Sequence, residues 1–463
     1  MVNTNKYIKK KYTRRNNKKR GIINKSKKKY FYKKPPQITK INGYNILFLP
    51  LKNETSTIVE CRIFGGRYLE HKKQSGISHL LEHILISGSK MCKKENCETF
   101  LDKNNIISNA FTDNMCTSYY LKGSSNKLNF MLKYLTSIVF DPNITNKLIK
   151  EEKKAVKYEL EMFMNDPMWM IYKKLYNSLF IPVGYKNSLD WELQSKLVDS
   201  ITLNDLIEHL KFTRNLNNML FTISGKYNYK HILKFFKNLK SLNRKIMIPN
   251  KIKNVGQCFT LKQQIITFKN SNFKSSNICI AFPINIKMNN EDRGFFGFII
   301  NLFSEGLNSI LLKKLRIELN LVYSIKININ TDECGTVVSI VTSTTDKHTN
   351  LVVNEILKLL KLYCKNLLNT TYLENRKISW IQGINNLCLT RPENVSSYYQ
   401  DQYFVQLNYK DKNIFTINDL INKINNLDKY ELRKIICRIF NFKNCIIVCG
   451  SKTYNKINIH KAL

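Results

Sequence analysis

The chain has 463 residues, of which 43% are hydrophobic and 11% aromatic, so it is too long for one ordinary core and too apolar for wholesale disorder. No apolar run reaches the roughly 18 residues of a membrane-spanning helix, and no secretory signal pattern opens the chain, so we expect a protein without a membrane span. The formal net charge is +41, but Lys and Asn are abundant along the whole chain, so the charge alone is weak evidence for an acidic partner.

Residues 1–36 predict a disordered basic arm. They contain no acidic residue, show no apolar periodicity and end at Pro35 and Pro36. Such an arm is either a solvated tail or a patch that contacts nucleic acid or another anionic surface. A mitochondrial presequence fits less well, because the arm is rich in Lys rather than in Arg and Ser.

Ordered structure is expected from Gln37 onward. The dipeptide Asn42-Gly43 lies between two β-prone runs, which predicts a hairpin. Apolar periodicity then predicts a third strand, a helix, an extended stretch and two amphipathic helices, over residues 56–66, 75–89, 107–123, 126–140 and 146–164.

Two distant segments resemble each other and indicate a duplication. Residues 216–229 and 441–455 each predict an apolar strand that ends at a glycine turn, at Gly225 and at Gly450. Helices and strands also follow one another in a similar order in the two halves, so we infer a duplicated α+β domain. The inferred domains and the polar linker between them cover residues 37–245, 258–463 and 246–257, respectively.

The twelve cysteines include no CxxC pair. Cys445 and Cys449 lie in an apolar, strand-like run. In a chain of this length without a signal peptide, this pattern predicts buried free thiols in a reducing compartment rather than a disulfide framework.

The stretch SGISHLLEHILISGS, residues 75–89, carries the strongest chemical signal. On a helix, His79 and His83 lie one turn apart and share a face, with Glu82 beside them. This is the H-x-x-E-H arrangement of the inverted zincins, in which two imidazoles bind zinc and the carboxylate takes a proton from zinc-bound water. The alternative is a core helix that tolerates two histidines. Its four apolar residues support a core position as well, so we expect the helix to serve both roles: Leu80, Leu81, Ile84 and Leu85.

Around this motif the chain resembles peptidase family M16, the family of insulin-degrading enzyme, pitrilysin and the mitochondrial processing peptidase. In that family a glutamate on a later helix completes the zinc site, and Glu159 lies 76 residues after His83 in this chain. Glu152 lies seven residues before Glu159 on the same helix face and is expected to support the ligands or to assist catalysis. The resemblance therefore implies one zinc ion held by His79, His83 and Glu159, with Glu82 and Glu152 as catalytic residues.

The segment SNAFTDNMCTSYY is similar to the edge strand of the family, which binds substrate by pairing with its backbone. The resemblance assigns Asn109, Ala110 and Phe111 to substrate binding.

The segment LLKKLRIELNLVYSI is similar to a family segment whose Arg and Tyr reach substrate near the scissile bond. The resemblance assigns these roles to Arg316 and Tyr323, which could stabilise a developing oxyanion. Where the family has a glycine, this chain has Asn320, and we expect the turn to survive because Asn tolerates left-handed backbone angles.

The resemblance covers residues 37–455 and implies two homologous M16-type α+β domains, each an antiparallel-rich sheet covered by helices, that face each other across a cavity. It implies a zinc-dependent metalloendopeptidase that hydrolyses peptides or unfolded polypeptides; whether it acts as a monomer or a dimer stays open. The composition is also similar to that of zinc proteases encoded by large DNA viruses, so we expect an intracellular protein, cytoplasmic or virus-associated. Two other interpretations remain: a non-catalytic partner subunit of the same family, and a nucleic-acid-binding protein that acts through the basic arm.

Overall fold

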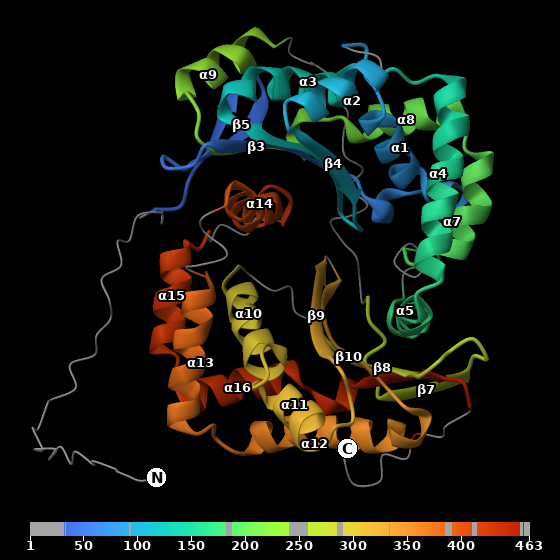
Figure 1. Ribbon diagram of the computed structural model, residues 1–463, viewed down its shortest axis with the longest axis vertical. Helices are drawn as coiled ribbons and strands as arrows, with labels where there is room; N and C mark the ends of the chain where they lie inside the picture. The colour runs from blue at the N-terminus through green and yellow to red at the C-terminus, as the bar shows by residue number, and fades with distance from the viewer. Residues whose placement is uncertain are drawn as a thin grey trace, which may run out of the picture.

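The computed structural model describes residues 32, 34–91, 94–181, 188–239, 258–284, 290–332, 334–384, 391–409, 414–453 and 457. These residues form two β-sheets covered by helices, one sheet in each half of the chain, and Figure 1 shows the sheets in the upper and lower halves of the molecule. The expected α+β class with two sheet-and-helix domains is confirmed. Among the described residues, no helix combines the length and the apolar character that crossing a membrane requires.

The N-terminal sheet has six strands in the order β1-β2-β6-β3-β5-β4, so β4 lies at its edge. Asn42 and Gly43 adopt positive φ angles of 49° and 86° and form the predicted hairpin turn between β1 and β2. The strands are β1 Ile38–Ile41, β2 Tyr44–Pro50, β3 Ser56–Phe64, β4 Ile107–Thr112, β5 Cys116–Ser124 and β6 Met219–Gly225.

The C-terminal sheet has five strands in the order β7-β11-β8-β10-β9. Its edge strand β9 pairs with β10, as β4 pairs with β5 in the first sheet. The strands are β7 Gln264–Lys269, β8 Ser276–Ile284, β9 Ile325–Asp332, β10 Gly335–Thr344 and β11 Ile446–Ser451.

Most helices of each half pack on the outer face of its own sheet, and each layer buries a continuous apolar core. The helices of the N-terminal half are α1 Ile77–Ile86, α2 Lys94–Lys103, α3 Leu128–Phe140, α4 Asn146–Met164, α5 Pro167–Leu179, α7 Trp191–Leu197, α8 Leu203–Thr213 and α9 Tyr229–Asn238. Those of the C-terminal half are α10 Asn290–Ser304, α11 Ile310–Leu312 with a π-helical continuation Lys313–Glu318, α12 Thr349–Lys365, α13 Thr370–Gly383, α14 Pro392–Tyr409, α15 Ile417–Asn426 and α16 Lys429–Ile439.

The topology of the two sheets explains the resemblance between the two halves of the sequence. β6 runs parallel to β2 and antiparallel to β3, and β11 runs parallel to β7 and antiparallel to β8. Gly225 and Gly450 therefore occupy equivalent places near the ends of equivalent strands. Gly225 has a positive φ of 121°, a conformation that suits glycine, whereas Gly450 does not have a positive φ. The two turns therefore differ in conformation.

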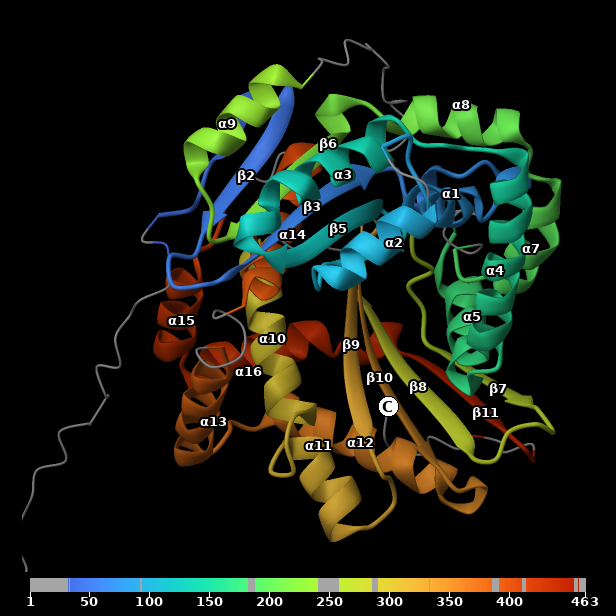
Figure 2. The same ribbon diagram turned by 45° about the horizontal axis from the view of Figure 1, so that its top comes forward.

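The two halves exchange one helix each. Val395 and Tyr399 of α14 pack against Leu47 and Leu220 of the N-terminal sheet. In the same way, apolar residues of α5 pack against β8 and β11 of the C-terminal sheet. Figures 1 and 2 both show α14 against the N-terminal sheet and α5 beside the C-terminal one. The inner face of each sheet is thus covered by a helix from the other half, and the halves are tied together by apolar contacts.

The predicted linker 246–257 lies outside the described residues, as do residues 1–31 and 33 of the predicted basic arm. Tyr32, near the end of that arm, is described and is held in place. Its ring lies 5.4 Å from the ring of Tyr399, measured between centroids, and its hydroxyl donates to the carbonyl of Pro50 at 3.2 Å. Tyr32, which the prediction places in a disordered arm, therefore packs against α14.

The expectation of free thiols is wrong for three described cysteines, because Cys97, Cys258 and Cys334 are disulfide-bonded. Cys258, before β7, forms a disulfide with Cys334, in the turn between β9 and β10, with their Cα atoms 5.2 Å apart. These residues lie 76 positions apart in sequence, so only the fold brings them together, and their spacing shows no motif. Cys445 and Cys449 are buried free thiols, as expected.

Candidate metal centre and substrate edge

The helix α1 is held firmly at its start. Gly76 precedes it with a φ of 95°, a left-handed conformation that suits glycine. The carboxylate of Glu70 accepts hydrogen bonds from the backbone N–H groups of Gly76 at 2.8 Å and of Ser78 at 2.9 Å, which satisfies donors at the helix N-terminus. On the opposite side, Ser78 Oγ lies 3.1 Å from Nε2 of the partly buried His209, whose pKa desolvation lowers to about 4. These contacts fix the direction in which α1 presents its polar residues.

The apolar side of α1 anchors it in the core, as predicted. The four apolar residues of the motif are all buried: Leu80, Leu81, Ile84 and Leu85. Because residues three and four positions apart share a helix face, this anchoring turns His79 and His83 together toward α4.

Glu159 of α4 meets the two histidines. Its Oε2 atom lies 3.3 Å from Nε2 of His79 and 3.0 Å from Nε2 of His83. One ligand atom from each of the three residues lies within 4.8 Å of the others. Thr145 caps α4 by accepting a hydrogen bond from the N–H of Leu148, so the helix begins at Asn146, as predicted. The structure therefore brings together the three residues that the sequence suggests as ligands.

Glu152, two turns before Glu159, holds the other nitrogen of His83. Its Oε2 atom lies 3.4 Å from Nδ1 of His83, and its Oε1 atom accepts a hydrogen bond of 2.6 Å from Ser87 Oγ. An acceptor at Nδ1 favours the tautomer that leaves Nε2 free for a metal. Nδ1 of His79 is buried and has no hydrogen-bond partner among the described residues, so only one of the two rings is oriented in this way.

His83 and Glu159 both have shifted pKa values. Although burial by itself would lower the pKa of His83, its hydrogen bonds to Glu152 and Glu159 outweigh that effect and raise the pKa to about 9. Hydrogen bonds from His79 and His83 hold the pKa of Glu159 well below its ordinary range, against the opposing effect of burial. A cation is therefore favoured at the place where these groups meet.

The donor set fits a zinc ion. Two imidazoles and one carboxylate are the protein ligands of many catalytic zinc sites. Zinc–ligand bonds of about 2.0–2.1 Å in a tetrahedron place neighbouring ligand atoms about 3.3 Å apart. The distances of 3.3 and 3.0 Å from Glu159 Oε2 to the two Nε2 atoms match this spacing.

Glu82 lies on the same helix but does not join the three ligands. It is buried, and its Oε2 atom accepts a hydrogen bond of 2.5 Å from Oγ1 of Thr112, the last residue of β4. A charge-assisted bond of this kind fixes the carboxylate beside the candidate ligands. Thr112 was not assigned a role from the sequence, although it is the Thr of the segment that resembles the family's edge strand.

β4 is an edge strand, and it carries the three residues assigned to substrate binding. These residues, Asn109, Ala110 and Phe111, pair with β5 on one side, and no strand of the described residues pairs with them on the other. Asn109 and Phe111 are exposed, and the N–H of Ala110 is satisfied by the side chain of Asn109 at 2.8 Å. An added peptide strand would have to displace this local hydrogen bond.

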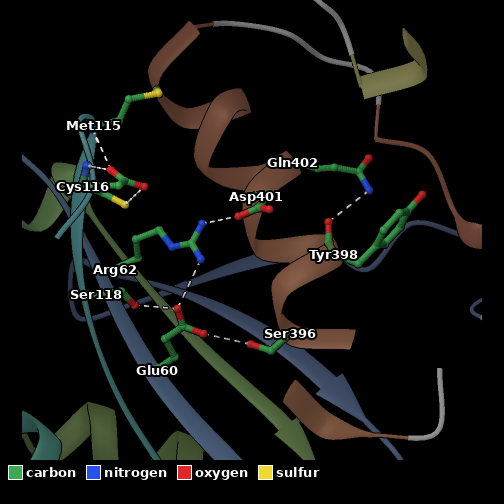
Figure 3. A network of polar contacts seen from close by, with 10 residues as sticks. Glu60, Arg62, Met115, Cys116, Ser118, Ser396, Tyr398, Asp401 and Gln402 are labelled. Carbon is green, nitrogen blue, oxygen red and sulfur yellow. Dashed lines mark hydrogen bonds and ion pairs between the residues drawn. The ribbon is translucent and has the colours of Figure 1, made fainter. Parts of the chain in front are cut away.

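A buried polar network links the inner face of this sheet to α14 and was not predicted. Figure 3 shows Glu60 and Arg62 of β3 facing Ser396 and Asp401 of α14. Arg62 pairs with Glu60 at 3.3 Å and with Asp401, and its guanidinium lies 5.7 Å from the ring centroid of Phe111. The network therefore reaches from the C-terminal half to the substrate edge.

Neutral donors complete the environment of Glu60. Ser118 Oγ donates to it at 2.6 Å and Ser396 Oγ at 3.2 Å. The side-chain amide of Gln400, oriented to donate, lies 2.8 and 2.6 Å from its two oxygens. Glu60 and Arg62 alternate on one face of an otherwise apolar strand, and this pattern could have indicated a buried ion pair. Their partners on α14 could not be identified from the sequence, because they lie more than 330 positions away.

The structure does not place Arg316 and Tyr323 beside the candidate metal ligands of the same chain. Arg316 lies in the π-helical segment after α11, and both figures of the whole molecule place α11 at the end opposite α1. The two residues contact each other, with the Arg316 guanidinium 4.7 Å from the centroid of the exposed Tyr323 ring. Asn320 has a φ of 49°, so the turn does take the left-handed conformation expected of it. The role of Arg316 and Tyr323 in substrate binding stays a prediction.

Comparison with known families gives matches over most of the chain. The family model described as Insulinase (Peptidase family M16) matches residues 51–189, and the one described as Peptidase M16 inactive domain matches residues 200–378. An "Uncharacterized zinc protease" of Rickettsia bellii is 24% identical over 292 residues, which are 61% of this chain and 67% of the relative. Zinc protease PqqE of Helicobacter pylori is 24% identical over 222 residues, 45% of this chain and 48% of the relative.

Solved structures show the same fold at low sequence identity. A protease from Helicobacter pylori superposes with a TM-score of 0.78 at 19% identity, covering 90% of this chain and 100% of the other. A peptidase M16 inactive domain from Pseudomonas fluorescens superposes with a TM-score of 0.76 at 13% identity, covering 90% and 98%. Together, the two family models, the relatives and the shared two-sheet fold show that this chain belongs to peptidase family M16.

Proposed function

We propose that the protein is a zinc-dependent metalloendopeptidase that cleaves peptides or unfolded polypeptides. One observation carries the proposal: Oε2 of Glu159 lies 3.3 and 3.0 Å from Nε2 of His79 and of His83, close to the spacing of zinc ligands, and Glu82 is fixed beside them. Relatives named zinc proteases support the same activity at low identity. His79, His83 and Glu159 would hold the ion, and Glu152 would steady His83.

A zinc ion held there would supply Lewis acidity, which lowers the pKa of water and polarises a peptide carbonyl. Glu82 accepts a proton from the attacking water and returns it to the leaving amine, as a general base and then a general acid. Its hydrogen bond from Thr112 keeps the carboxylate in position throughout. Because Glu82 is buried, bulk water competes little for that proton.

The edge of β4 is the proposed binding site for substrate backbone. Residues 109–111 lie on the strand whose last residue contacts Glu82, so a peptide paired with β4 would run toward the catalytic carboxylate. Backbone pairing depends little on side chains and requires an extended segment. Peptides and unfolded chains meet this requirement, whereas a folded domain does not expose such a segment.

The activity is assigned to the N-terminal half alone. α10 follows β8 as α1 follows β3, so it occupies the equivalent position in the C-terminal half. Its sequence, NEDRGFFGFIINLFS, contains no histidine and cannot supply the two imidazoles. The match of residues 200–378 to an inactive domain agrees with this assignment and does not bear on the motif in α1.

Metal analysis combined with peptide digestion tests the proposal. The purified protein should contain one zinc per chain and should cleave a mixed library of unstructured peptides. A chelator should stop the cleavage, and added Zn²⁺ should restore it. A zinc-free protein that cleaves none of the peptides after zinc addition would instead indicate a non-catalytic partner subunit.

A further inference from the structure

A cavity of about 630 Å³ lies between the two halves of the protein. Its wall on one side comes from the N-terminal half and includes Arg67, Thr112 and Asn114. On the other side, Phe296, Ile300 and Ile329 of α10 and β9 form an apolar wall. A volume of this size holds one or two amino-acid side chains of a ligand.

The cavity opens beside the candidate catalytic carboxylate. Thr112 lines it and also donates a hydrogen bond of 2.5 Å to Glu82. Because Thr112 ends β4, a peptide paired with β4 would pass from the edge strand directly into this space. The residues of a substrate next to the cleaved bond would therefore lie in the cavity.

Arg67 gives the cavity an unsatisfied positive charge. It forms no ion pair with any described residue, and its Nε atom is buried without a hydrogen-bond partner. The neighbouring carboxylates are engaged elsewhere. Asp113 accepts hydrogen bonds from the backbone N–H groups of Met115 and Cys116, at 2.7 and 2.6 Å.

Glu70 is the other acidic group near Arg67, and its two oxygens bind the start of α1 through Gly76 and Ser78. It interacts with Arg67 only through longer-range electrostatics. The side-chain oxygen of Asn114 is also buried without a partner, while its nitrogen donates to Tyr68 at 2.8 Å. Buried polar groups of this kind are normally satisfied, so their partners are expected to come from a ligand.

We propose that this cavity is a substrate subsite in which Arg67 binds a carboxylate of the peptide, while Phe296, Ile300 and Ile329 contact the adjoining apolar atoms. The inference rests on the proposed peptidase function. The carboxylate is either an acidic side chain close to the cleaved bond or the free C-terminus of a short peptide. The protein thus favours acidic peptides, in keeping with its strongly basic composition.

The test uses one unstructured peptide in matched versions that differ at a single position. At each position around the cleavage site, Glu, Gln and Lys are compared, and a free C-terminus is compared with an amide. Cleavage gives kcat/KM, and fluorescence anisotropy of labelled peptides gives Kd without any need for cleavage. A charge-assisted hydrogen bond to Arg67 should favour Glu over Gln by about tenfold at one position, or the free C-terminus over the amide by a similar factor.

Variants assign the preference to the cavity. Arg67→Gln should abolish it, and Arg67→Glu should reverse it in favour of Lys. Lys226→Gln removes one positive charge from an exposed residue that does not line this cavity and should leave it unchanged. Asn330→Asp, in the opposite wall, should weaken the preference without touching Arg67.

Equal affinity of the wild type for the Glu, Gln and Lys peptides and for both C-terminal forms would overturn the inference. So would a preference that persists in both Arg67 variants. If the protein binds peptides with the predicted preference but cleaves none, the proposed enzyme activity fails and the subsite stands. If it cleaves peptides without any preference for a carboxylate, the activity stands and the subsite fails. Should the Arg67 variants fail to fold, judged by circular dichroism, the result for Asn330→Asp decides.

Discussion

Replacing Arg62 by Met tests how α14 is held against the N-terminal sheet. The side chains of Arg62 and Glu60 are 9% and 6% exposed, so the ion pair between them is buried. The side chain of Asp401 is 48% exposed, so solvent screens its pair with Arg62 and that contact contributes less. Removing the guanidinium leaves the Glu60 carboxylate buried with neutral donors only.

Breaking a buried ion pair by removal of one partner costs about 3–5 kcal/mol. The hydroxyl groups of Ser118 and Ser396 and the amide of Gln400 still donate to Glu60, so we expect the lower end, about 3 kcal/mol. Because Glu60 lies on β3 and its remaining donors lie partly on α14, the loss should appear first as detachment of α14.

Urea unfolding followed by circular dichroism measures the stability change, and hydrogen exchange measures the protection of α14. Lys211→Met is the matched control, because it removes a cation from an exposed ion pair with Glu208 and should cost at most about 1 kcal/mol. The double variant Glu60→Gln/Arg62→Met should recover part of the stability, since it leaves no buried charge. The reasoning is refuted if Arg62→Met is no less stable than Lys211→Met, or if the double variant is as unstable as the single one.

Four further outcomes are expected. Thr112→Val removes the hydroxyl that donates to Glu82 and should lower kcat in peptide cleavage about tenfold at unchanged zinc content. Thr112→Ser keeps the hydroxyl and should retain near-normal kcat. Equal rates for wild type and both variants would contradict the role of this bond. Glu152→Gln should weaken zinc binding about 10- to 100-fold in competition with a chelator, and undiminished affinity would show that Glu152 does not orient the ligand. The pKa of His83 is raised to about 9 from an ordinary value of 6.5, so zinc binding at pH 7 should release a proton. Zinc affinity should therefore increase as the pH rises toward 9. Calorimetry in buffers of different ionisation enthalpy measures the proton release. In the metal-free protein the same raised pKa stabilises the fold fully below pH 6.5, and this contribution should disappear as the pH rises through about 9 in urea unfolding curves.

Local sequence patterns were sufficient for the individual elements near the site. Helical spacing after Gly76 predicted α1, and the Asn42-Gly43 turn predicted the first hairpin, because both depend on neighbouring residues. The His79–His83 pair was readable for the same reason, since one helical turn sets its spacing. Glu159 was out of reach of such reasoning and came only from the family resemblance, because the contact between α1 and α4 joins residues 76 positions apart.

Contacts between the halves could not be predicted. The exchange of α5 and α14 places each helix on the sheet of the other half, although its own sequence neighbours pack elsewhere. The Arg62–Asp401 pair depends on the same arrangement, and the Cys258–Cys334 disulfide joins two residues of the C-terminal half that lie 76 positions apart. Their residues look ordinary in the sequence, because a buried polar residue is recognised only when its distant partner is known.

The most direct test of the central claim compares wild type, Glu82→Gln and Glu159→Ala for zinc content and peptide cleavage in the same preparations. Wild type should hold one zinc per chain and cleave peptides. Glu82→Gln should keep its zinc and lose cleavage by about 100-fold or more, because it cannot accept the proton. Glu159→Ala should lose both zinc and cleavage, since one of three ligands is gone. Cleavage by Glu82→Gln at the wild-type rate, or full zinc content in Glu159→Ala, would contradict the account.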